Sequence, residues 1–206
     1  MNKRVIAQFT LVVVTISAHS QALSQTRCSL TEATSPSIRG LRLGMSTQEL
    51  LALFPGSVKS WAKEPKEIRE VREKALDPNG NLPFWLVFDP TTDAARDQFA
   101  SVDSVSVGVY KGRVTDFSLV YSGTEWNNID EWVAKVSESL RLPGRQAWVT
   151  GPSEAPNKVL NCTGIEIEAA IQGGGSSIRI RNTEYLKGPD DRANTLHEKK
   201  RRDFKP

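Results

Sequence analysis

Residues that could act as nucleophiles or metal ligands are few in this 206-residue chain. Its two histidines lie toward the chain ends, His19 near the N-terminus and His197 in a charged C-terminal stretch. A serine or cysteine nucleophile needs a histidine base within hydrogen-bond reach, and zinc sites usually draw on histidine and cysteine. The sequence therefore predicts neither a catalytic triad nor a zinc site, and it predicts no cofactor.

Carboxylates are plentiful, so acid–base chemistry stays open. A small carboxylate-dependent hydrolase is therefore one function that the sequence allows, as an alternative to a non-enzymatic role. Asp89, Asp93 and Asp97 share a polar stretch and could gather around calcium, a hard cation that takes oxygen ligands. The stretch lacks the EF-hand spacing and its glycine, so we expect a solvated loop there. The run from Gly173 to Gly175 has no following Lys-Ser/Thr and no following helix, which indicates a hairpin loop rather than a phosphate-binding loop.

The N-terminal residues have the composition of a secretory signal. Lys3 and Arg4 form a charged start, Val5–Ala18 is mostly apolar, and small and polar residues follow. A membrane span needs about 20 apolar residues, and this run is shorter. We expect residues 1–24 to be a cleaved signal peptide, with an uncleaved anchor as the alternative. The protein is thus expected to be secreted or periplasmic, with no transmembrane segment once the signal is removed.

Both cysteines, Cys28 and Cys162, follow the predicted signal. In an oxidising compartment paired cysteines tend to form a disulfide. A lipid on Cys28 is a weaker interpretation, because Arg27 stands where a lipoprotein signal has a small residue. Two unpaired thiols are the other alternative. The sequence predicts a disulfide between Cys28 and Cys162.

The five tryptophans suggest a binding face, because aromatic side chains are favoured anchors in interfaces. Trp126 falls on an apolar helical stripe and is expected in the core. Trp132 lies off that stripe beside Glu131, so we expect it to be half exposed. Trp61, in a polar segment, is the best candidate for an exposed aromatic. Trp61 and Trp132 are therefore the predicted binding surface, with core packing as the alternative role.

Charge narrows the class of partner. The chain has 27 Lys and Arg against 24 Asp and Glu, and Lys187–Pro206 carries seven basic and four acidic residues. We expect residues 187–206 to form a disordered charged tail. A body so close to neutrality has no general attraction for nucleic acid or anionic lipid. An envelope or extracellular protein is the expected partner.

Three helices are predicted from capping signals and apolar periodicity. Ser46 and Glu49 form a capping box, and Pro55-Gly56 is expected to end that helix. A second helix is predicted from Pro65 to about Ala75, and a third from about Glu125 to Leu140. The apolar face of the second helix is formed by Ile68, Val71 and Ala75.

Alternating apolar residues predict strands and two hairpins. The predicted strands cover residues 84–88, 105–109, 117–121, 146–150, 165–171 and 178–180. Consecutive hairpins make an antiparallel sheet, and helices segregated on one face of it define an α+β fold. We expect a single domain over residues 26–186, with two similar helix–hairpin halves as a further interpretation.

One stretch resembles a known pattern. Gly44-Met45-Ser46, Glu49-Leu50 and Phe54-Pro55-Gly56 are similar to the opening helix of the SmpA/OmlA family of envelope lipoproteins. That family consists of small outer-membrane assembly factors with helices on a three-stranded antiparallel sheet. The same stretch resembles the tandem helix–sheet units of β-lactamase inhibitory protein. The resemblance covers about a dozen residues, and this chain departs from the family in lacking a lipidation cysteine.

The resemblance implies a compact envelope or extracellular module that works through its surface, and it carries over no catalytic residues. Fold resemblance does not by itself fix function. Together with the scarcity of catalytic side chains, it leads to one expected function: a secreted or periplasmic, non-enzymatic binding module of the cell envelope.

Overall fold

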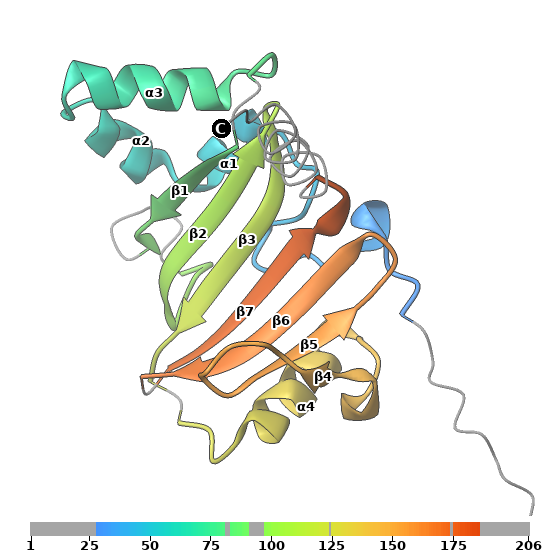
Figure 1. Cartoon of the computed structure of the whole chain (residues 1–206). Helices are drawn as coiled ribbons and strands as arrows, with labels where there is room; N and C mark the ends of the chain where they lie inside the picture. The colour runs from blue at the N-terminus through green and yellow to red at the C-terminus, as the bar shows by residue number, and fades with distance from the viewer. Residues whose placement is uncertain (1–27, 81–82, 91–96, 124, 174, 186–206) are drawn as a thin grey trace, which may run out of the picture.

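The computed structural model describes residues 28–80, 83–90, 97–123, 125–173 and 175–185 (Figure 1). These residues form helices and a seven-stranded antiparallel sheet of order β1-β2-β3-β7-β6-β5-β4, which confirms the α+β class. The predicted signal peptide at 1–24 and the charged tail at 187–206 lie outside the described residues. No helix in the described ranges is long and apolar enough to cross a membrane.

Two meanders make up the sheet. The first contains β1 (Phe84–Phe88), β2 (Val102–Tyr110) and β3 (Arg113–Tyr121). The second contains β4 (Val149–Thr150), β5 (Asn157–Asn161), β6 (Ile165–Gln172) and β7 (Gly175–Asn182). Their last strands, β3 and β7, pair antiparallel at the centre of the sheet. Both predicted hairpins are confirmed, whereas β5 lies in a stretch for which the sequence predicts no strand.

Strand register gathers the apolar side chains on one face. Because register partners point to the same side of a sheet, a row of them forms a continuous surface. One row crosses six strands, and each of its members is at most 2% exposed: Leu86, Val107, Phe117, Ile180, Ile167 and Leu160. The helices cover this face, α4 (Ile129–Leu140) over β5 and β6, and α1 (Thr47–Leu53) against β3.

The first helix begins as predicted. Ser46 Oγ accepts a hydrogen bond from the Glu49 amide, and the Glu49 carboxylate accepts one from the Ser46 amide at 2.7 Å. The helix does end before Pro55-Gly56, but the chain does not leave helical structure there. A second short helix, α2 (Pro55–Trp61), starts at that proline, because the fixed backbone of proline suits a first helical position.

The helix that was predicted from Pro65 is present as α3 (Lys66–Leu76) and starts after that proline. Its apolar face is largely exposed. Ile68 is 48% and Val71 is 54% exposed, while Ala75 is buried. The helix turns its neighbouring face, with Arg72, toward α2. Periodicity predicted the helix correctly and its buried side incorrectly.

The helix α4 begins four residues later than the predicted Glu125. Asn128 stands at its N-cap, where its side-chain oxygen accepts the Glu131 amide at 3.0 Å. Asparagine is among the preferred N-caps because this bond satisfies an otherwise unpaired amide. Arg141, in the left-handed conformation, ends the helix.

The predicted disulfide between Cys28 and Cys162 is present. The two Cα atoms are 4.5 Å apart, and the residues are separated by 134 positions in sequence. Cys28 is 7% exposed and lies beside the short 3-10 helix η1 (Glu32–Thr34). Glu32 in turn accepts a hydrogen bond from the Asn182 side chain on β7. The N-terminal segment is thereby fixed to the second meander.

Candidate ligand-binding site

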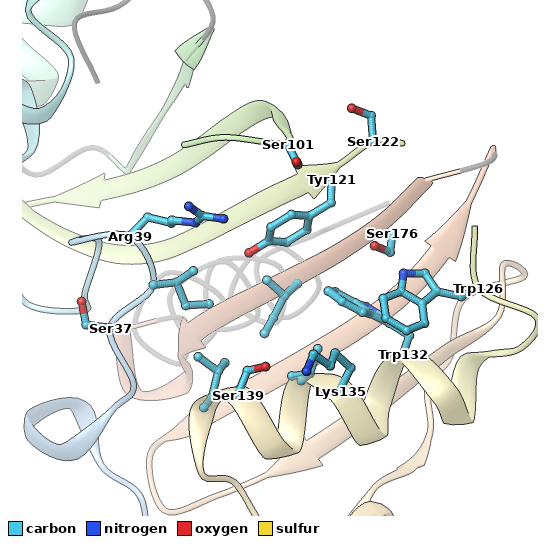
Figure 2. A pocket seen from close by; sticks show the side chains of 14 residues that line it. Ser37, Arg39, Ser101, Tyr121, Ser122, Trp126, Trp132, Lys135, Ser139 and Ser176 are labelled. Carbon is cyan, nitrogen blue, oxygen red and sulfur yellow. The ribbon is translucent and has the colours of Figure 1, made fainter. Parts of the chain in front are cut away.

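A cavity of about 330 Å³ opens where the two meanders meet (Figure 2). Its sheet wall contains Tyr121 and Ser176, which are register partners near the ends of β3 and β7. The helix α4 supplies the opposite wall through Trp132 and Val136, and the turn at Arg39 supplies one end. Volumes of this size are typical of small-molecule sites. The cavity therefore combines the turn at Arg39 with residues of β3, α4 and β7.

Aromatic rings form the wall at the start of α4. The Trp132 ring centroid lies 5.1 Å from that of Trp126 and 5.6 Å from that of Tyr121. Trp132 is 7% exposed, and its indole N–H donates to the Ser177 carbonyl at 2.9 Å. The expectation of a half-exposed Trp132 is wrong, because this residue lies one helical turn before Val136 and on the same buried face.

Trp126, which was expected in the core, precedes α4 and is partly buried. The apolar stripe does not extend to it, because the helix begins at Ile129. Its ring still packs on Trp132, so it forms a wall of the cavity instead of part of the central core.

Two buried polar atoms of the cavity lack a hydrogen-bond partner. Among the described residues five buried side-chain nitrogen or oxygen atoms are unpartnered, and Ser176 Oγ and Trp126 Nε1 are two of them. Ser176 is 2% exposed. Buried polar groups are nearly always hydrogen-bonded, and leaving one unpaired costs about 1–3 kcal/mol. A molecule that accepts from these two groups would remove that cost.

Arg39 is placed by a strained turn. Ile38 and Leu41 exchange both backbone hydrogen bonds at 2.9 Å, so Arg39 and Gly40 are the two central residues of a tight hairpin turn. Their φ angles are 56° and 88°, the left-handed values that such a turn requires. Glycine adopts this conformation freely, but arginine rarely does, at a cost on the order of 1 kcal/mol. Strain of this kind is concentrated at functional sites.

Hydrogen bonds then hold the Arg39 side chain. Its two terminal nitrogens donate to the carbonyls of Gln98 and Ala100 at 2.7 and 3.2 Å, and the Gln98 side chain donates back to the Arg39 carbonyl. A guanidinium has five N–H donors, so donors remain. Within the described part of the chain no carboxylate forms an ion pair with Arg39.

Tyr121 lies between Arg39 and the tryptophan pair (Figure 2). Burial raises the pKa of its phenol, and the positive charge of Arg39 offsets part of that rise. The hydroxyl therefore stays protonated at neutral pH and can donate a hydrogen bond. The residues that line the cavity thus include the N–H donors of Arg39 and Trp126 and the O–H donors of Tyr121 and Ser176.

The structure does not bring the two predicted surface tryptophans together. Trp61 lines a separate cavity of about 280 Å³ between α2 and α3. It is partly buried instead of exposed: its ring lies 5.5 Å from that of Phe88, and the Arg72 guanidinium lies 4.2 Å from its centroid. Trp132 belongs to the cavity beside α4.

The described residues do not bring the carboxylates of Asp89 and Asp97 together into a metal-binding group. Of the predicted trio, Asp93 lies outside them, and Asp97 lines a hollow of about 300 Å³ together with Asp103. Asp103 accepts a hydrogen bond from Ser122 at 2.5 Å. The described ranges contain no group of three His, Cys, Asp or Glu that could hold a metal ion. The hydrolase alternative stays a prediction.

The opposite face of the sheet carries ion pairs among its described residues. Asp116, 2% exposed, accepts hydrogen bonds from Arg179 at 2.9 and 2.5 Å. Burial raises the pKa of Asp116, and the Arg179 guanidinium lowers it in part. The same guanidinium lies 5.1 Å from the Trp85 ring. Asp116 and Arg179 therefore have each other as hydrogen-bonding partners, and Trp85 packs against the guanidinium.

Sequence reasoning missed Arg39, Tyr121 and Ser176. The Arg39-Gly40 pair between two apolar residues was a visible turn signal, whereas the meeting of Tyr121 with Ser176 depends on the pairing of β3 with β7. Comparisons with protein-family models, with curated proteins and with solved structures found no match. The cavity is therefore interpreted from its geometry.

Proposed function

We propose that this protein is a secreted or periplasmic, non-enzymatic binding module of the cell envelope, and that the cavity beside α4 is its binding site. One observation carries the proposal: Ser176 Oγ and Trp126 Nε1 are buried without a hydrogen-bond partner, and both residues line an aromatic-walled cavity. Apolar walls with a few convergent polar groups are the usual construction of a ligand site. The signal-like order of residues 1–24 and the Cys28–Cys162 disulfide support an oxidising compartment.

Titration with N-phenyl-1-naphthylamine, a neutral aromatic probe, tests the site. Probe emission should rise and saturate, because the probe leaves water for the aromatic walls. Ser139, exposed on α4 and lining the cavity, allows the mouth to be blocked. Ser139→Trp should weaken binding at least about tenfold, equivalent to 1.4 kcal/mol.

Ala134→Trp is the matched control, since Ala134 is exposed on the same helix and does not line the cavity. It should bind the probe like the unmodified protein. Absence of saturable binding, or equal affinity in the two tryptophan variants, would contradict the proposal.

Export is tested separately by N-terminal sequencing of protein recovered from the periplasm or the medium. The sequence should begin between Gln21 and Thr26. Protein that keeps Met1, or that is recovered from the cytoplasm, would contradict the proposed compartment without affecting the binding site.

A further inference from the structure

We propose that the cavity selects a small organic anion, with its carboxylate at Arg39 and an apolar or aromatic body along the tryptophan wall. The inference rests on the proposed function and narrows its ligand to one chemical class. Figure 2 shows Arg39 and the pair of Trp126 and Trp132 at opposite ends of the cavity. A ligand that fills the length of the cavity therefore meets a cation at one end and aromatic rings at the other.

The charge of the lining has one sign. Among the described residues that line the cavity, Arg39 and Lys135 are charged, and neither Asp nor Glu is present. Lys135 forms an exposed ion pair with Glu138 at 3.1 Å, which offsets its charge at the rim. The positive charge of Arg39 is not offset by an ion pair within the described residues. An anion is therefore favoured at this end.

The hydrogen-bonding groups also define the ligand. Arginine and the indole N–H can only donate, and the protonated Tyr121 hydroxyl can donate as well. The unpartnered Trp126 Nε1 requires an acceptor at the tryptophan end, and the unpartnered Ser176 hydroxyl can donate to an acceptor as well. A carboxylate can accept hydrogen bonds from the guanidinium of Arg39 and the phenol of Tyr121. Hydrogen bonds of this charge-assisted kind are stronger than neutral ones. A carbonyl or sulfonyl oxygen in the body of the ligand can accept hydrogen bonds from Trp126 Nε1 and Ser176 Oγ.

Backbone strain supports the same assignment. Four non-glycine residues in the described ranges have positive φ, and two of them, Arg39 and Ser101, line the cavity. The two segments are tied together where Arg39 donates to the Ala100 carbonyl. The guanidinium is thus preorganised by backbone contacts, which reduces the conformational entropy that a bound anion must overcome.

Two probes that differ only in the carboxylate test the inference. Dansylglycine carries an aromatic body, sulfonyl oxygens and a carboxylate, and dansylglycinamide carries a neutral amide in its place. Dansyl emission should report at least about tenfold tighter binding of dansylglycine at low ionic strength, and the preference should shrink in 0.5 M salt because ions screen an exposed guanidinium.

Variants then assign the preference to Arg39. Arg39→Gln should bind both probes about equally, and Arg39→Lys should keep part of the preference, because it keeps the charge and loses the planar fork. Arg42→Gln is the matched control: Arg42 is exposed, pairs with Glu49 and lies outside the cavity lining. It should keep the full preference. Thermal melts of all variants should be measured to check that each is folded.

The outcomes separate the inference from the proposed function. Equal affinity for the two probes, with Ser139→Trp still blocking both, overturns the anion inference and leaves the binding site in place. A preference that survives in Arg39→Gln, or one that 0.5 M salt leaves unchanged, also overturns it. Failure of both dansyl probes and of N-phenyl-1-naphthylamine to bind contradicts the inference and the proposed function together.

Discussion

The helices α3 and α4 carry the same kind of amphipathic pattern and differ in what they cover. On α4 the apolar residues Trp132, Val133 and Val136 are at most 7% exposed. On α3 the corresponding residues Ile68 and Val71 are about half exposed. The helix α4 lies across β5 and β6, whereas α3 lies toward the β1 side of the sheet with α2 beneath it (Figure 1).

This difference shows that periodicity predicts a helix but not the surface that it meets. A helix above the middle of a meander buries its apolar face even when that face is rotated slightly about the helix axis, because apolar strands lie beneath it on both sides. A helix near the edge strand finds apolar partners on one side only. The cavity belongs to the α4 side for the same reason: Trp132 extends over the β3–β7 junction and forms a wall there.

The disulfide should have the largest effect, because it attaches the N-terminal segment to the second meander. Replacing Cys28 and Cys162 by serine should lower the free energy of unfolding by about 5 kcal/mol, the entropic value for a loop of this length. Urea denaturation measures it. A loss below about 1 kcal/mol would show that the contacts of the segment, such as Glu32 with Asn182, suffice to hold it.

The next effect distinguishes the two tryptophans of the cavity. Trp132→Ala should cost about 3–5 kcal/mol, the usual range for a large buried truncation, and Trp126→Ala should cost clearly less because that residue is only partly buried. Urea midpoints of the two variants give the comparison. Equal losses would mean that the wall of the cavity is as important for stability as the core beneath α4.

Two matched valine-to-alanine substitutions test the contrast between the helices directly. Val133→Ala on α4 removes two methyl groups from a fully buried side chain and should cost about 2 kcal/mol. Val71→Ala on α3 should change stability by less than about 0.5 kcal/mol, since Val71 is exposed and alanine is the better helix former. A comparable cost at both positions would show that a covering partner, or a second copy, buries the α3 face.

The smallest effect concerns the capping box of α1 and its dependence on pH. The Ser46 amide, the Ser46 hydroxyl and Arg42 lower the pKa of Glu49 below its ordinary 4.5. A pKa that is lower in the folded state stabilises the protein above the unfolded value, and this stabilisation is lost as the pH falls through the folded pKa.

Glu49→Gln should therefore be less stable than the unmodified protein at neutral pH, and the difference should close as the pH falls below 4.5. Melting temperatures across this range measure it. Glu154→Gln, in an exposed loop, is the control and should show no such convergence. A constant difference at all pH values would show that ionisation of Glu49 does not stabilise the α1 cap.

Local chemistry in the sequence was sufficient for several elements. The capping box at Ser46 and Glu49 predicted the start of α1, because the bonds involved join residues three apart. Alternating valines predicted β2 for the same reason of short range. The disulfide followed from counting cysteines in a chain with a signal-like start, an argument that needs no fold.

Tertiary structure alone decided the site. Tyr121 meets Ser176 because β3 and β7 pair at the centre of the sheet, and Arg39 reaches them because Gln98 and Ala100 hold its turn in place. Each of these contacts joins residues more than 50 positions apart. A sequence pattern records which face of an element is apolar, but the partner of that face is set by chain topology. For this reason the exposure of Trp132 and Trp61 was predicted wrongly, although the fold class was predicted correctly.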